Sequence, residues 1–203
     1  MNANKREESL TLEILEKIEK HDNLTQRHLA DSLGVALGLA NSYMKRCVRK
    51  GLIKVHQAPA NRFLYYLTPK GFAEKSRLTT EYLSSSFNFY RRASASCSEV
   101  FKQCHELGHD KVLLCGLSEL AEIASLRASE QGIEIIGTLE RNTRTKLFLG
   151  LPVWNSFDLL SDFDACVVTD VKEPQKIIEY IVTQIDSEIV FVPDILGIKK
   201  ELE

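Results

Sequence analysis

Polar and cationic side chains recur between residues 36 and 49 at the spacing of one helical face. At 3.6 residues per turn, positions 38, 41, 42, 45 and 49 fall on a single stripe. The amide of Asn41 can form two hydrogen bonds with adenine, and Lys45 or Arg46 can donate to guanine or to a phosphate oxygen. Gly38 would let the backbone approach a groove closely. These residue types predict contact with the bases and phosphates of duplex DNA.

Two helices and a tight turn are predicted to position this stripe. The first helix covers residues 25–32 and begins at Thr25, a residue type that caps helices well. Gly34 supplies the positive φ that the turn requires. The second helix runs from about residue 36 to residue 50 and stops at Gly51. This order is a helix-turn-helix, whose second helix fits the major groove.

A two-stranded ribbon is predicted to follow the second helix. Residues 52–56 and 63–68 are β-rich runs, and the loop between them ends at Arg62. Helix, turn, helix and ribbon together predict a winged helix-turn-helix. Arg62 would reach the minor groove or its phosphates. The residues predicted to contact DNA are Gln26, Arg27, Leu37, Gly38, Asn41, Ser42, Lys45, Arg46, Arg49 and Arg62.

Apolar residues at helical spacing predict the interior of this domain. A helix over residues 9–21 carries one apolar stripe, and the inner faces of the next two helices complete the core. The predicted interior residues are Leu10, Ile14, Leu15, Ile18, Leu29, Leu33, Val35, Leu39, Met44 and Val48.

Charge divides the 203 residues into two unlike halves. Residues 1–95 hold 16 Lys and Arg against 9 Asp and Glu, a balance of +7, whereas residues 96–203 hold 10 against 19, a balance of −9. A basic half suits a phosphate-rich partner. There is no apolar run of about 18 residues and no signal peptide, so no membrane association is expected. Five cysteines without CxxC spacing favour a reduced, cytoplasmic location.

Three segments of the basic half resemble the MarR-like winged-helix regulators. They are residues 24–35, residues 49–55 and residues 66–75, the last with a YxLTxxG pattern. Residues 37–41 and 77–79 are similar to the branch associated with exopolysaccharide loci. The resemblance implies a transcriptional regulator and a surface-polysaccharide regulon.

A long helix is expected between residues 69 and 107, because this stretch has one glycine near its start and no proline after its first residue. Apolar residues recur along it every seven positions. This seam predicts homodimer formation and a near-palindromic operator, or else packing of the helix on its own domains. The seam residues are Leu83, Phe87, Tyr90, Ser94, Cys97, Phe101 and Cys104.

Apolar β-rich runs alternate with helical segments from residue 111 to residue 193, which predicts a Rossmann-like parallel sheet. The expected fold class is therefore α+β and α/β. The expected domains are a winged helix-turn-helix at 1–70, a connecting and dimerisation helix at 71–108, and the Rossmann-like domain at 109–203.

The first turn of this sheet is a candidate nucleotide site. Gly116, Ser118 and Ala121 occupy the three positions of a G-x-G-x-x-G/A motif, and Glu140 ends the next strand, where a ribose-binding acid belongs. Serine at the second position and the acidic start of the following helix disfavour phosphate. A dinucleotide, another nucleotide or nucleotide sugar, and no small ligand all remain open.

Two further resemblances bear on this second domain. A winged helix followed by a Rossmann domain is similar to the Rex-type redox repressors, which sense NADH. Residues 148–154 and 157–160 look like the small N-terminal domain of sugar acyltransferases, where the first turn contacts a nucleotide sugar. That resemblance carries over to Gly116, Ser118 and the region of Glu140.

Together these patterns predict a DNA-binding transcription regulator with a sensor or assembly domain and no resident cofactor. A nucleotide or nucleotide sugar would be its small-molecule effector. No catalytic constellation and no convincing metal ligand set occur in the sequence, so no enzymatic activity is expected. The alternative is a sugar-nucleotide-binding protein or an accessory protein of glycan biosynthesis.

Overall fold

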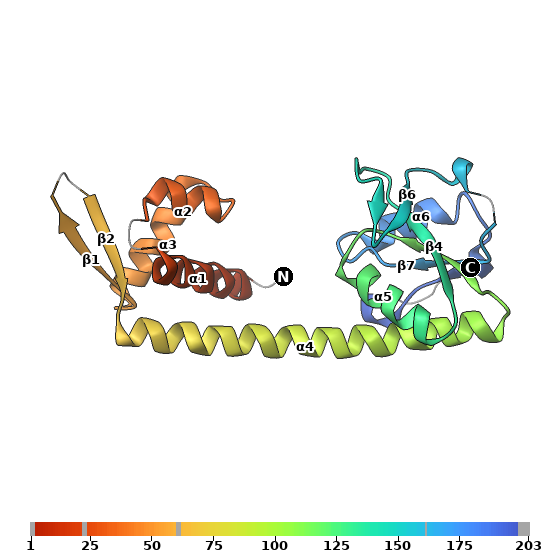
Figure 1. Cartoon of the computed structure of the whole chain (residues 1–203), viewed down its shortest axis with the longest axis horizontal. Coiled ribbons are helices and arrows are strands. Elements are labelled where there is room, and N and C mark those ends of the chain that lie inside the picture. Colours follow the sequence, from red (N-terminus) through yellow and green to blue (C-terminus); the bar gives the residue numbers. More distant parts are fainter. Residues whose placement is uncertain (1–2, 22–23, 60–61, 161, 199–203) are drawn as a thin grey trace. The chain divides into compact units, whose positions relative to one another are not determined.

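The computed structural model describes residues 3–21, 24–59, 62–160 and 162–198. The chain divides into two compact units, Met1–Phe87 and Asn88–Glu203. One uninterrupted helix, α4 (Pro69–Glu106), contributes residues to both units (Figure 1). Within the described ranges, no helix is long and apolar enough to cross a membrane.

The first unit has the predicted order of three helices and a wing. The wing strands pair antiparallel, with Ile53 opposite Leu67 and Ala58 opposite Arg62. The fold prediction for this unit is therefore confirmed. Its elements before α4 are α1 (Ala3–Lys20), α2 (Gln26–Ser32), α3 (Leu37–Arg49), β1 (Ile53–Ala58) and β2 (Arg62–Leu67).

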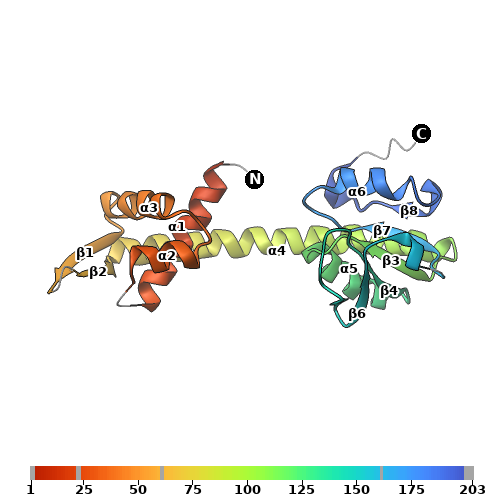
Figure 2. The ribbon, with the colours of Figure 1, turned by 90° about the horizontal axis from the view of Figure 1, so that it is seen from above.

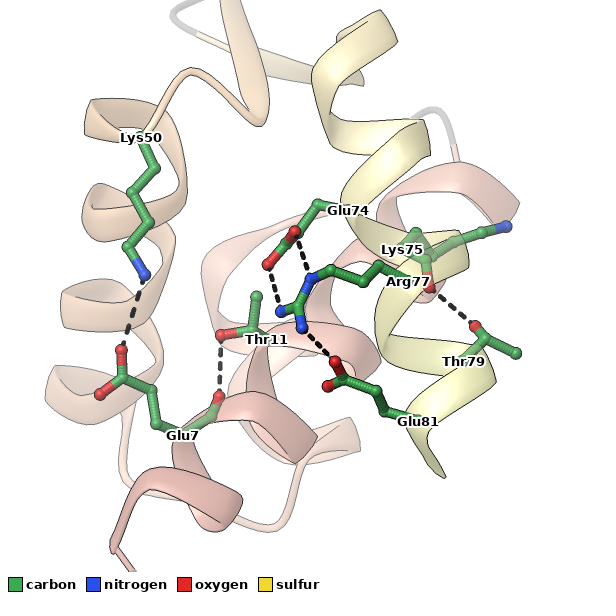
Figure 3. A network of polar contacts seen from close by, with 8 residues as sticks. All are labelled: Glu7, Thr11, Lys50, Glu74, Lys75, Arg77, Thr79 and Glu81. Carbon is green, nitrogen blue, oxygen red and sulfur yellow. Dashed lines mark hydrogen bonds and ion pairs between the residues drawn. The ribbon is translucent and has the colours of Figure 1, made fainter. Parts of the chain in front are cut away.

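Local side-chain chemistry fixes the ends of α2 and α4. The Thr25 hydroxyl accepts a hydrogen bond from the His28 amide at 3.1 Å, which caps α2 as predicted. Thr68 caps α4 in the same way, because its hydroxyl accepts from the Gly71 amide at 3.0 Å. The same hydroxyl donates to the Gly51 carbonyl at 2.7 Å, so the start of α4 is tied to the end of α3. Exposed ion pairs join Arg77 to Glu74 and Glu81 on α4 (Figure 3).

The buried core of the first unit draws on every helix and on the wing. α1 starts six residues earlier than the predicted Ser9 and buries Ile14 and Leu15 completely. α3 buries a different face from the one predicted, as described below. The core residues are Leu12, Ile14, Leu15, Ile18, Leu24, Leu29, Met44, Cys47, Leu52, Ile53, Tyr65 and Leu78.

The second unit is built on a six-stranded mixed sheet of order β5-β6-β4-β3-β7-β8. The four predicted strands, β3, β4, β7 and β8, are confirmed as parallel neighbours. The sequence did not indicate β6, which pairs parallel with β4, or β5, which adds an antiparallel edge. Its strands are β3 (Lys111–Cys115), β4 (Glu134–Leu139), β5 (Leu147–Phe148), β6 (Leu151–Trp154), β7 (Ala165–Val168) and β8 (Val190–Phe191). Its helices are α5 (Glu119–Glu130), α6 (Pro174–Ile181) and three 3₁₀ turns at Phe157–Leu159, Ser187–Ile189 and Asp194–Leu196.

Helices cover both faces of this sheet, as Figure 2 shows. Val112 and Leu114 of β3 pack with α5 and the end of α4, whereas the alternating residues Leu113 and Cys115 pack with α6. Three residues of the predicted dimer seam, Cys97, Phe101 and Cys104, are fully buried in the first of these clusters. That half of the seam serves the chain's own core, so the intermolecular reading was wrong there. Burial also raises the pKa of the Cys97 thiol to about 11, which leaves it unreactive.

Candidate nucleic-acid interface

The outward face of α3 carries the polar stripe. Ala40, Met44 and Cys47 turn toward the core of the first unit, with exposed fractions of 3% or less. On the opposite side of the helix, Gly38, Ser42, Lys45 and Arg49 are exposed, and Leu37 at the start of α3 is exposed as well. Groups that can bond to DNA are therefore presented together to solvent.

The prediction of which residues α3 buries was wrong at two positions. Leu39 and Val48 are 41% and 37% exposed. Val35, before the helix, is only half-buried. The helix is rotated so that the small residues Ala40 and Cys47 pack inward instead, which brings the backbone of α3 close to α1 and α2. Leu39 and Val48 then flank the polar stripe.

Asn41 lies at the edge of the stripe and is half-buried. Its Oδ1 is fully buried and has no hydrogen-bond partner among the described residues. Reading adenine requires both the oxygen and the nitrogen of the amide. In this conformation Asn41 presents at most its nitrogen, so the side chain must rotate before it can pair with adenine.

Arg46 is held by a residue that the sequence interpretation did not include. Its guanidinium pairs with the Glu7 carboxylate of α1 and lies 5.5 Å from the centre of the Tyr43 ring. The hydrogen bond from Arg46 lowers the pKa of the Glu7 carboxyl. Lys50 lies 3.8 Å from the same carboxylate (Figure 3). Arg46 must leave Glu7 to reach DNA, whereas no ion pair to Lys45 or Arg49 is found within the part of the chain that the structure describes.

A shallow groove of about 320 Å³ separates α3 from the wing. Its walls are mainly apolar, and Lys45 and Arg49 line it from the α3 side. Gln26 also lines it and donates to the Tyr65 hydroxyl at 3.2 Å, so this predicted contact residue is already engaged. Arg27 is exposed on α2. The groove places two cations beside an apolar floor.

Arg62 begins β2, opposite Ala58, which places its backbone beside the wing loop. Its side chain lies outside the described residues, so the predicted contact of Arg62 with the minor groove stays a prediction. Lys54 was missed by the sequence interpretation although it is exposed on β1. The alternation of the strand was the available signal, because Ile53 is buried and its neighbour must face outward.

Comparison with known families bears on this geometry. Residues 8–54 match the model of a family described as winged helix-turn-helix DNA-binding. The first unit contains a winged helix-turn-helix DNA-binding domain. No curated protein matches the chain. In this domain α3 occupies the place of the major-groove helix, and β1 and β2 form the wing.

The second unit has a cavity of about 310 Å³ at the carboxyl ends of β3, β4 and β7. Ser118 and Glu140 line it, as do polar residues of the loops that follow β4 and β7. Gly116 stands just before the cavity with φ +115°, and a Cβ there would lie 2.5 Å from the Asp170 amide. The three residues predicted to bind a ligand are thus brought together at one edge of the sheet.

Three backbone amides at this edge are already occupied. The Ser118 hydroxyl accepts from the amides of Leu120 and Ala121 at 3.1 and 3.3 Å. The Glu140 carboxylate accepts from the Leu117 amide at 3.2 Å. These are the donors that a phosphate would need at a helix N-terminus. Side chains of the chain itself therefore compete with a phosphate for these three amides.

Proposed function

We propose that the protein is a sequence-specific transcription regulator that binds duplex DNA and acts by binding rather than catalysis. The observation that carries this proposal is the exposed stripe of Ser42, Lys45 and Arg49 on the outward face of α3. That stripe lies in a domain whose family binds DNA. The cations would neutralise phosphates, and the short polar side chain of Ser42, one turn before Lys45, would face base edges.

Salt dependence tests this proposal. Four exposed cations, Arg27, Lys45, Arg49 and Lys54, lie on α2, α3 and β1 of one chain. If each neutralises one phosphate, the logarithm of the association constant should fall with the logarithm of salt concentration at a slope of about −3.6 per chain. Fluorescence anisotropy with a labelled duplex from the DNA upstream of its own gene measures the slope. A shuffled duplex should bind more weakly, and a slope near zero would contradict the proposal.

The finer aspects of the proposed regulator rest on sequence resemblance. Similarity to MarR-like proteins supports control of surface-polysaccharide genes, and the five cysteines without CxxC spacing support a cytoplasmic location. A homodimer would present two α3 helices to two half-sites of one operator. The sequence resemblance of the second unit to Rossmann domains supports a sensor or assembly role. The occupied amides beside Ser118 and Glu140 argue against NADH and other phosphate-bearing effectors.

An uncharged, hydroxyl-rich effector fits the cavity of the second unit better. Hydroxyl, amide and carboxylate groups line it, and acidic side chains outnumber the single Lys172. A nucleoside or free sugar should raise the melting temperature of this unit, whereas the matched phosphate ester should not. Asn142→Leu, inside the cavity, should remove the shift, and Gln131→Leu, outside it, should not. A larger shift with the phosphate ester, or none with any compound, would overturn this assignment.

A further inference from the structure

One stretch of α4 exposes large apolar side chains. Five of the nine residues from Tyr82 to Tyr90 are aromatic or leucine, and the stretch contains no charged residue. The exposed fractions are 61% for Tyr82, 45% for Leu83, 57% for Phe87, 39% for Phe89 and 40% for Tyr90. We name these five residues the α4 band.

The α4 band occupies one side of the helix. At 3.6 residues per turn, Tyr82 and Phe89 lie beside Leu83, Phe87 and Tyr90, with the small Ser86 among them. The opposite side carries only polar and charged residues, which are Glu81, Ser84, Ser85, Asn88, Arg91 and Arg92. Such amphipathic division is expected of a helix that buries one side.

Farther along, the same side of α4 is buried. Cys97 and Cys104 follow Leu83 and Tyr90 at seven-residue steps, and both are fully buried in the core of the second unit. The α4 band therefore continues a packed stripe beyond the point where the chain's own α5 and β3 cover it. Exposed apolar patches of this kind mark interaction sites, so we expect an apolar surface to pack against the α4 band.

We propose that the α4 band is the interface between two copies of this chain, paired through α4. A two-fold interface brings each patch against itself, so any charge in it would face its like. The absence of charge from residue 82 to residue 90 satisfies this condition. The proposal rests on the proposed DNA-binding function, because two copies would present two α3 helices to adjacent half-sites.

The size of the α4 band suits a weak-to-moderate dimer. Aromatic side chains bury about 150–250 Å² each, and roughly half of each is exposed here, so one copy offers on the order of 500 Å². Two copies would together bury about 1,000 Å², near the lower limit for a specific interface. We therefore expect association in the micromolar range, strengthened when both copies hold one DNA duplex.

Sedimentation equilibrium of the full chain without DNA tests the interface independently of DNA binding. The native chain should dimerise, and Leu83→Glu with Phe87→Glu should raise the dissociation constant at least about 100-fold. Both side chains are exposed, so the variant should keep its circular dichroism spectrum and melting temperature. The matched control, Ser84→Glu with Asn88→Glu, places the same charges on the opposite side and should dimerise normally.

Three results would overturn the α4 band as the interface. They are a native chain that is monomeric at 100 μM, a Leu83/Phe87 variant that dimerises normally, and a control that loses dimerisation equally. DNA binding is measured separately at protein concentrations below the dissociation constant of the dimer. A monomeric variant that still binds a single half-site with a steep salt dependence would keep the DNA-binding proposal intact, whatever the fate of the dimer.

Discussion

Replacing Lys45 and Arg49 together by alanine is expected to weaken binding to duplex DNA on the order of 100-fold at low salt. Both side chains are exposed on the outward face of α3 and line the groove beside the wing. Their removal forfeits two phosphate contacts, so the salt slope should fall from about −3.6 to about −1.8 per chain. Anisotropy titrations at several salt concentrations measure both quantities.

The matched control removes two lysines from the acidic second unit. Lys102→Ala with Lys176→Ala changes the net charge by the same amount, and both side chains are exposed. DNA affinity and salt slope should stay close to those of the native chain. If the control loses as much affinity as the α3 variant, binding depends on overall charge, and α3 is not the DNA-contacting element.

Gly71→Ala is expected to destabilise the first unit by about 2–3 kcal/mol. A Cβ at residue 71 would lie 2.1 Å from the Leu52 carbonyl oxygen. That oxygen also accepts from the amide and the hydroxyl of Thr68, so it cannot move away without breaking the tie between α4 and the wing. The melting transition of this unit should fall by roughly 10–20 °C in differential scanning calorimetry.

Gly38→Ala is the matched control for this substitution. Gly38 is also helical and in the same unit, but a Cβ there meets nothing within 4 Å. Alanine favours helix over glycine, so this variant should gain about 0.5–1 kcal/mol. Equal melting temperatures for the two variants would show that the close approach of α4 to Leu52 is not a tight constraint.

Strong local signals made the fold of the first unit predictable. Thr25 and Gly34 mark the boundaries of α2 and its turn, and Gly51 marks the end of α3, so three elements could be placed from residue chemistry. The rotation of α3 was harder to predict. Its buried side uses Ala40 and Cys47, small residues that carry a weaker apolar signal than Leu39 and Val48.

The contacts that sequence reasoning missed depend on residues far apart in the chain. Glu7 was overlooked because α1 was expected to start at Ser9, and its pairing with Arg46 needs the packing of α1 on α3. The seven-residue pattern of α4 was visible, but packing within a chain and packing between chains require the same pattern. The burial of Cys97 assigns it to packing within the chain, whereas Leu83 is exposed, as a residue that packs between chains would be.

The continuity of α4 determines where the protein can be truncated. Leu78 completes the hydrophobic core of the first unit, and Cys97 and Phe101 complete that of the second. A single helix therefore supplies core residues to both units. A fragment ending at residue 70, or one starting at residue 109, would lack part of its own interior. Fragments that fold separately must instead divide α4 between residues 87 and 88, because a cut there removes no core side chain from either fragment.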